Sequence, residues 1–154
     1  MKISEILKGD FIIPDLAARE KIGVIEELTR FLKNNGTIED REALTQALME
    51  REKLGSTGIG ECVAIPHAKS QEIGQILVLF ARSTTGVDFD SLDQKPVHFV
   101  CLVIAPTAST GHHLKALARI SRLLKSESLR EEILKATDAS AIHAAILEED
   151  SKFI

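Results

Sequence analysis

The chain has 154 residues with 44% hydrophobic and 27% charged content, which is enough to build one globular domain around a sizeable core. Its formal net charge of −4 and the lack of a dense Lys and Arg cluster argue against a nucleic-acid partner. The longest apolar runs, 76–81 and 97–105, fall far short of the roughly 20 residues of a membrane span, and the N-terminus lacks a signal-peptide pattern. We therefore expect a single cytoplasmic domain over residues 1–154 that is not inserted in a membrane.

The first elements are predicted to be a short helix, a brief strand and a longer helix. Ser4 can cap the short helix, and residues 10–13 before a proline are typical of a strand. Apolar residues then recur at helical spacing up to Gly36, which can end a helix. These positions are Ile22, Ile25, Leu28 and Leu32.

A second long helix is expected to begin at Thr37 or Asp40 and to end near Leu54, before Gly55. Arg51 lies in its last turn, on the same side as the apolar positions that precede it. Its aliphatic stem should therefore follow the apolar face, with the guanidinium near the start of the next segment. A cation at a helix C-terminus is favourable for structural reasons alone, and charge stabilisation of a phosphoryl group is the functional alternative.

The middle of the chain is predicted to contain strands. Residues 62–65 form a short one, and residues 75–82 and 97–104 form longer ones that are apolar enough for the centre of a covered sheet. The two long strands are expected to pair across a connection framed by Gly86 and Pro96. Strands in the middle with helices at both ends predict a layered α/β fold.

The C-terminal part is predicted to be helical from residue 111, with shorter helices at 127–135 and 139–149. In the first of these helices His113 shares a face with Leu117 and Ile120, whereas His112 is expected to be solvated. A histidine in a first helical turn lies where free N–H groups favour an anion. A hydrogen bond to a neighbour at the edge of the core explains an inward-facing histidine equally well.

The stretch GSTGIG at residues 55–60 is suited to an anion without matching a nucleotide motif. A P-loop needs a lysine after the last glycine, where this chain has glutamate, and a dinucleotide fingerprint needs a third glycine where it has valine. Gly58 and Gly60 permit positive φ and close backbone approach, and Ser56 and Thr57 offer hydroxyl donors. A tight connection between a helix and a strand explains the glycines as well.

His67 follows Pro66 and the short apolar strand that comes after the glycine-rich stretch. A lone histidine beside a strand is more often structural than functional. However, neutral imidazole is a competent nucleophile near pH 7, and a side chain beyond a strand end is presented by a rigid scaffold. Next to an anion-binding loop, phosphorus is the atom that such a nucleophile would attack.

These residues closely resemble the fructose/mannitol-type enzyme IIA domain of the bacterial phosphotransferase system, and more narrowly the nitrogen-regulatory enzyme IIA. The similarity covers nearly the whole chain, from about Ile3 to Ile146. It is carried by the segments 51-REKLGSTGIG-60, 64-AIPHAK-69, 89-FDSLDQKPV-97, 105-AP-106 and 113-HLKALARI-120.

The resemblance implies a three-layer α/β/α sandwich with a mixed central sheet, and a phosphohistidine intermediate on His67. It implies that His113 supports His67 by hydrogen bonding, that Arg51 holds the phosphoryl oxygens, and that the hydroxyl of Thr57 belongs to the same site. Ser56, Gly58 and Gly60 complete the expected phosphoryl-binding loop. A histidine phosphocarrier would be the donor, and no cofactor is expected.

Three functions stay open. The one that we expect is a regulatory, nitrogen-type phosphocarrier that controls other proteins. The alternative is a sugar-specific component that passes the group to an enzyme IIB. The third is an interaction module without chemistry, against which the presence of His67, Arg51 and His113 argues. The chain departs from its relatives at Glu61–Cys62, where they often have glycine or asparagine followed by glycine. Glu61 is expected to point outward, and Cys62 to narrow the pocket. A metal site formed by Cys62 with the two histidines is not expected, and both cysteines should be reduced.

Overall fold

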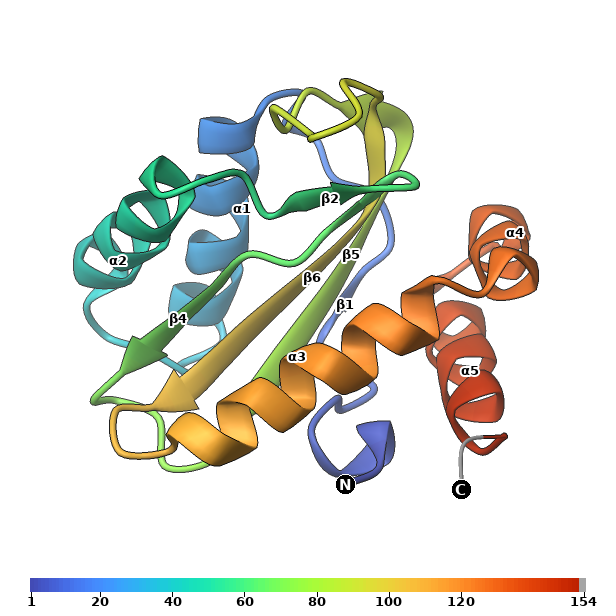
Figure 1. The fold of residues 1–154 in the computed structure, drawn as a ribbon. Coiled ribbons are helices and arrows are strands. Elements are labelled where there is room, and N and C mark those ends of the chain that lie inside the picture. The colour runs from blue at the N-terminus through green and yellow to red at the C-terminus, as the bar shows by residue number, and fades with distance from the viewer. Residues whose placement is uncertain (153–154) are drawn as a thin grey trace.

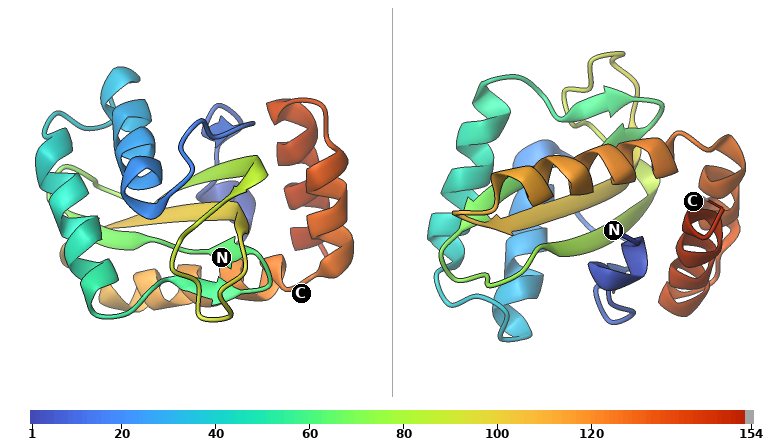
Figure 2. Two further views of the ribbon diagram at one scale, coloured as in Figure 1. Left: turned by 90° about the horizontal axis from the view of Figure 1, so that it is seen from above. Right: turned by 60° about the horizontal axis from the view of Figure 1, so that its bottom comes forward.

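The protein forms a mixed six-stranded sheet between two layers of helices, as seen in a computed structural model that describes residues 1–152 (Figure 1). The expected α/β sandwich with a mixed central sheet is therefore confirmed. Seen from above, two helices cover one face of the sheet and the C-terminal helices lie on the other (Figure 2). The sheet contains β1 (Ile12–Ile13), β2 (Gly58–Gly60), β3 (Val63–Ala64), β4 (His67–Ser70), β5 (Leu77–Val87) and β6 (Val97–Pro106).

The two long strands form the centre of the sheet, which has the order β1-β5-β6-β3-β2. β5 and β6 are antiparallel, and most of their residues are buried on both faces, as their continuous apolar sequences predict. β3 and β4 both run parallel to β6, one after the other along the same edge. This edge is where His67 lies, opposite Val103.

One face of the sheet is covered by α1 (Lys21–Asn34) and α2 (Arg41–Lys53). The side chain of Asp40 accepts a hydrogen bond from the backbone of Ala43, so α2 begins at the Asp40 cap and not at Thr37. The prediction for Ile22 was wrong. Its side chain is 56% exposed because the second residue of α1 faces outward, and Val24 takes the buried position.

The other face is covered by α3 (Thr110–Leu124), α4 (Glu127–Lys135) and α5 (Ala139–Asp150), close to the predicted bounds. The chain starts with a single 3-10 turn, η1 (Ile3–Glu5). Ser4 lies inside this turn and does not cap it, since the cap position is Lys2. The backbone N–H of Ile3 donates to the carboxylate of Asp150 at 2.9 Å, which fastens the N-terminus to the end of α5.

Two strands, β2 and β4, were not predicted. The glycines of β2 and the polar sequence HAKS of β4 show no apolar alternation, which is the signal of a half-buried strand. Both strands exist because neighbouring backbone needs partners: β4 pairs in parallel with β6, and β2 pairs with β3 in a hairpin. β5 is also longer than predicted, because it continues through the polar residues 83–86.

The hairpin between β2 and β3 turns at Glu61 and Cys62, which have positive φ values of 56° and 68°. A two-residue turn with positive φ at both positions favours Asn-Gly, so glutamate and cysteine are strained here, by about 1–3 kcal/mol each. The carboxylate of Glu61 lies 3.3 Å from the guanidinium of Arg130 in α4. Glu61 therefore points outward, as predicted.

Candidate functional site

His67 begins β4, and its ring is held in one tautomer by the backbone. Nδ1 lies 2.8 Å from the carbonyl oxygen of Ile65, which can only accept a hydrogen bond, so Nδ1 carries the proton. The other ring nitrogen, Nε2, then carries its lone pair in the plane of the ring. The half-buried ring thus presents a neutral nitrogen nucleophile on the edge of a rigid sheet.

Arg51 reaches His67 from the last turn of α2, where the sequence placed it. Its Nε donates to Nε2 of His67 at 3.3 Å, and its Nη1 donates to the carbonyl oxygen of Gly55 at 2.9 Å. The second bond fixes the guanidinium to the loop that follows α2. A cation therefore stands directly at the nucleophilic atom, with further N–H groups available for an anion.

His113 faces His67 from the first turn of α3. The two ring centroids are 5.4 Å apart and the ring planes are nearly perpendicular, at 88°. His113 is only 7% exposed, whereas its neighbour His112 is exposed, as predicted. Nε2 of His113 is buried and has no hydrogen-bond partner within the described residues. A buried polar atom without a partner is costly, so this nitrogen is suited to receive a polar group that enters the site.

Burial lowers the pKa of His113, and the charges of His67 and Lys69 lower it further. The folded protein therefore resists protonation at pH values where the unfolded chain, with an ordinary pKa of 6.5, takes up a proton. Since the unfolded state binds more protons in this range, stability rises with pH. We expect the free energy of unfolding of the wild type to fall relative to that of His113→Gln as the pH decreases from about 7.5 to about 5. Denaturant titrations across this range measure the difference, and parallel pH profiles for the two proteins would contradict it.

The hydroxyl groups of Ser56 and Thr57 are engaged inside the protein. Ser56 Oγ donates to the carbonyl oxygen of Phe89 at 2.8 Å and accepts from the N–H of Gly58. Thr57 is 3% exposed, and its hydroxyl donates to the carboxylate of Glu52. The expectation that these two hydroxyls bind the phosphoryl group directly is therefore not supported by the geometry. They shape the loop instead.

The glycines of this loop act in two different ways. Gly60 has a φ of 103°, so it uses the freedom expected of it. Gly58 does not have a positive φ, and its requirement is space: a Cβ atom there would lie 2.9 Å from the Cα atom of Ser91. The residues 89–92 thus pack directly against the glycine-rich segment.

Three charged residues at this site were not predicted. Glu52 holds the loop and pairs with Lys21 from α1, at 3.0 Å. Lys69 lies two residues after His67 on the same side of β4, and its Nζ donates to the hydroxyl of Thr110 at 2.8 Å. The sequence could have predicted Lys69, because residues i and i+2 of a strand lie on the same face. Nothing in the sequence indicated that Glu52 would be buried.

Cys62 does not belong to this site. Val63 lies opposite Phe99 and His67 lies opposite Val103 on β6, which separates them by four residues, or about 13 Å of strand. The expectation that Cys62 narrows the pocket was therefore wrong. Within residues 1–152, no group of three or more His, Cys, Asp and Glu side chains is arranged to hold a metal ion.

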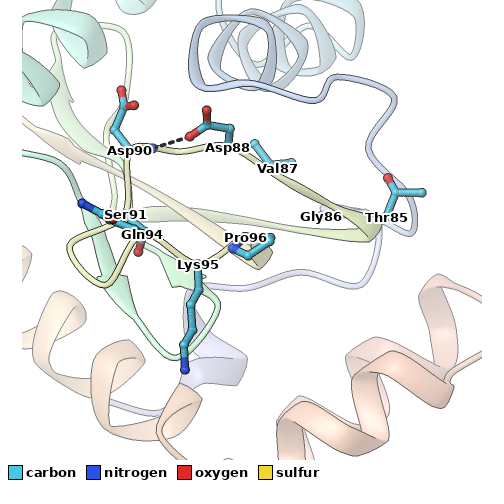
Figure 3. A pocket seen from close by; sticks show the side chains of 9 residues that line it. All are labelled: Thr85, Gly86, Val87, Asp88, Asp90, Ser91, Gln94, Lys95 and Pro96. Carbon is cyan, nitrogen blue, oxygen red and sulfur yellow. Dashed lines mark hydrogen bonds between the residues drawn. The ribbon is translucent and has the colours of Figure 1, made fainter.

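A surface pocket of about 470 Å³ lies elsewhere, at the connection between β5 and β6. In Figure 3 the carboxylates of Asp88 and Asp90 point to one side of the loop, and the side chain of Lys95 extends to the opposite side. The hydrogen bond drawn there joins the N–H of Asp90 to the carboxylate of Asp88. These groups do not converge on a common point, so the pocket does not have the form of a catalytic site.

Large apolar side chains are exposed on the segments that carry the site. Leu54 follows Arg51 at the end of α2, Leu114 follows His113, and Ile59 lies in β2; they are 84%, 63% and 43% exposed. Apolar side chains beside a polar centre are typical of a surface that docks another protein. We refer to Leu54, Ile59 and Leu114 as the apolar rim.

The fold is that of IIA proteins of the phosphotransferase system. The crystal structure of nitrogen regulatory protein IIA-Ntr from Neisseria meningitidis is 32% identical, with a TM-score of 0.85 over 94% of this chain and 98% of that one. IIA mannitol from Escherichia coli shares the fold at 23% identity, with a TM-score of 0.76 over 90% of this chain and 97% of that one.

The chain belongs to the family described as phosphoenolpyruvate-dependent sugar phosphotransferase system, EIIA 2, whose profile matches residues 5–149. This confirms the resemblance noted in the sequence and makes the protein a phosphotransferase component. No helix within residues 1–152 is both long and apolar enough to span a membrane.

Relatives in the family carry two kinds of name. A nitrogen regulatory protein of Bradyrhizobium diazoefficiens is 37% identical over 146 residues, and a fructose-specific EIIA component of Haloferax volcanii is 36% identical over 146 residues; each match covers 95% of both chains. A fructose-specific EIIABC component of Bacillus subtilis is 40% identical over 150 residues, or 97% of this chain. The chain spans 24% of that larger protein.

Proposed function

We propose that the protein is a phosphoryl carrier that accepts a phosphoryl group on Nε2 of His67 from the phosphohistidine of a small phosphocarrier protein. The observation that carries this proposal is the bond from Nδ1 of His67 to the carbonyl oxygen of Ile65, because it leaves Nε2 as the nucleophile. Arg51 and His113 both contact the same ring. The family to which the chain belongs supports a transfer reaction.

The chemical step is an in-line exchange of one P–N bond for another. The lone pair of His67 Nε2 attacks the phosphorus, and the P–N bond of the donor breaks, with its electron pair returning to the donor imidazole. The hydrogen bond that Arg51 Nε donates to Nε2 in this structure must break before the phosphorus can approach. The ring of His67 keeps its Nδ1 proton and becomes an imidazolium when the new P–N bond forms, while the donor ring, protonated at its other nitrogen, becomes a neutral imidazole, so no proton needs to leave the site.

Charge on the phosphoryl oxygens is stabilised by groups already in place. Arg51 can turn its N–H groups from Nε2 to the oxygens, while its bond to Gly55 keeps the guanidinium near. His113 Nε2, which is buried without a partner, can donate to an oxygen, and the first turn of α3 adds the positive end of its dipole. Lys69 contributes a further cation on the same side of β4. The apolar rim provides the contact surface for the donor.

For the biological role, we propose a regulatory, nitrogen-type enzyme IIA in the cytoplasm, whose phosphorylation state controls binding to target proteins. The support is the similarity to the Neisseria meningitidis IIA-Ntr structure, at 32% identity and a TM-score of 0.85. The alternative is a sugar-specific IIA that passes the group to an enzyme IIB. It is favoured by the fructose-specific relative at 36% identity. A complex of Escherichia coli mannitol IIA with phosphorylated IIB, 23% identical to this chain, shows the shared fold in such a partnership.

The test is intact-mass analysis after incubation with phosphoenolpyruvate, enzyme I and a histidine phosphocarrier. We expect an acid-labile gain of about 80 Da, the mass of one phosphoryl group. Addition of a fructose-type enzyme IIB then separates the two roles, since a sugar-specific IIA would be discharged and a regulatory one would keep its label. If a competent donor set transfers no label, the protein is an interaction module and not a carrier.

A further inference from the structure

Glu52 is a buried carboxylate at the end of α2, directly after Arg51. Its side chain is 2% exposed, which is costly for a charged group unless it is paired and hydrogen-bonded. Both conditions are met: Oε1 accepts from the N–H of Thr57 at 3.0 Å and lies 3.0 Å from Lys21 Nζ, and Oε2 accepts from the hydroxyl of Thr57. All these partners come from other segments or from the glycine-rich loop.

The bonds of Glu52 fix the loop that holds Arg51. The backbone N–H of Gly55 donates to the carbonyl oxygen of Glu52 at 3.1 Å, and the side chain of Glu52 binds the same loop two residues later, at Thr57. Arg51 in turn donates to the carbonyl oxygen of Gly55. The position of the guanidinium beside His67 is thus defined by a loop that Glu52 holds at both ends, through its backbone carbonyl at Gly55 and through its carboxylate at Thr57.

We propose that Glu52, with Lys21 as its counter-ion, is a positioning residue for phosphoryl transfer, which acts by holding the loop at residues 55–57 so that Arg51 stays on His67. This inference rests on the proposed function of His67. Glu52 touches neither the phosphoryl group nor His67, and acts only through Arg51. Because Glu52 directly follows Arg51, the last turn of α2 carries both the guanidinium and the carboxylate that keeps it in position.

Lys21 explains why a carboxylate and not a neutral amide occupies this position. It is 11% exposed on its side chain, lies 5.0 Å from the centre of the Phe89 ring, and has a second carboxylate, Asp90, at 3.7 Å. The ammonium group therefore joins α1, α2 and the residues 89–92 that pack on Gly58. Loss of the charge on Glu52 would leave this cation buried against a weaker partner.

The first experiment compares Glu52→Gln with the wild type in phosphoryl acceptance from a phosphorylated histidine phosphocarrier. We expect the transfer rate to fall about 10- to 100-fold at saturating donor, with little change in the donor concentration for half-maximal rate, because misplacement affects the chemical step and not docking. Glu27→Gln is the matched control. Its carboxylate also accepts backbone N–H bonds, from Ala17 and Ala18, but on α1 away from the site, and it should transfer at the wild-type rate.

The second experiment asks whether Glu52 acts through Arg51. In an Arg51→Ala background, Glu52→Gln should slow transfer less than about 2-fold further, because the group that it positions is already gone. A full additional loss in that background would overturn the inference, as would a Glu52→Gln variant that transfers at the wild-type rate. Both rates are measured on folded protein, and the methyl region of the ¹H NMR spectrum of each variant verifies its packing, since the chain has no Trp or Tyr.

A measurement without any donor separates this inference from the proposed function. Ring ¹⁵N shifts of His67 report the contact of Nε2 with Arg51, and we expect them to move in Glu52→Gln toward the values of Arg51→Ala, while Glu27→Gln leaves them unchanged. If the wild type accepts no phosphoryl group but the shifts move as expected, the proposed function fails, and only the conclusion that Glu52 holds Arg51 on His67 stands. Unmoved shifts in Glu52→Gln would sink the inference, whatever the wild type transfers.

Discussion

Replacing His67 with glutamine is expected to abolish phosphoryl acceptance, with no label detectable under conditions that label the wild type completely. The effect should be total because the amide has no nucleophilic lone pair at the position of Nε2, and no neighbour can substitute for it. His113 is the nearest alternative, yet its ring is only 7% exposed, beside that of His67.

The control for this prediction is His112→Gln, which removes the exposed neighbour in α3 and should leave labelling unchanged. Glutamine at position 67 can still donate to the carbonyl oxygen of Ile65, so the fold around β4 should be kept. The measurement is the intact mass of the wild type, His67→Gln and His112→Gln after incubation with the donor proteins. An acid-labile gain in His67→Gln would mean that another residue is the acceptor, and peptide fragmentation would identify it.

The main elements of the site could be predicted from the sequence because each has a local pattern of apolar and polar residues. Helical periodicity placed Arg51 in the last turn of α2 and His113 on the inner side of α3, and the structure shows both side chains at His67. The apolar sequences of β5 and β6 identified the centre of the sheet. In these cases burial and periodicity agree, so pattern alone is informative.

The rest depended on contacts between distant segments. β4 is polar and exists because β6 offers an unpaired edge, which no local pattern reveals. The hydroxyls of Ser56 and Thr57 looked like anion donors, but their partners, Phe89 and Glu52, come from outside the glycine-rich stretch. Whether a hydroxyl is free to bind a ligand is decided by the tertiary structure, and the sequence could only supply the candidates.

The strained turn at Glu61–Cys62 illustrates a further limit. The departure from glycine was visible in the sequence, and its effect was expected in the pocket. In the structure the departure instead strains the backbone of the β2–β3 hairpin, where both residues have positive φ. The cysteine side chain packs on the core, and the glutamate pairs with Arg130 on the surface. These contacts offset part of the strain, and neither of them reaches His67.

The second large effect is expected on stability, from Arg82 in β5. Its side chain is 6% exposed, and it donates to three backbone carbonyl oxygens: Nε to Pro14 at 2.8 Å, and Nη1 to Ile133 at 2.7 Å and Ala136 at 2.6 Å. The last two lie at the C-terminal end of α4, where helix carbonyls have no partners in the helix itself. One guanidinium thus joins the segment after β1, the central sheet and α4.

Arg82→Met should therefore lower the free energy of unfolding by about 3–5 kcal/mol, because methionine fills much of the same volume but leaves three acceptors without donors, at about 1–3 kcal/mol each before any relaxation. The stability of Arg82→Lys should lie between those of the wild type and Arg82→Met, since a single ammonium group cannot reach all the carbonyl oxygens that the guanidinium binds. Denaturant unfolding with unchanged m-values is the measurement, and Arg30→Met, at an exposed position of α1, is the control with an expected change below about 0.5 kcal/mol. A loss of less than about 1 kcal/mol in Arg82→Met would show that water replaces the guanidinium at these carbonyls, and that α4 is held on the sheet by its apolar face alone.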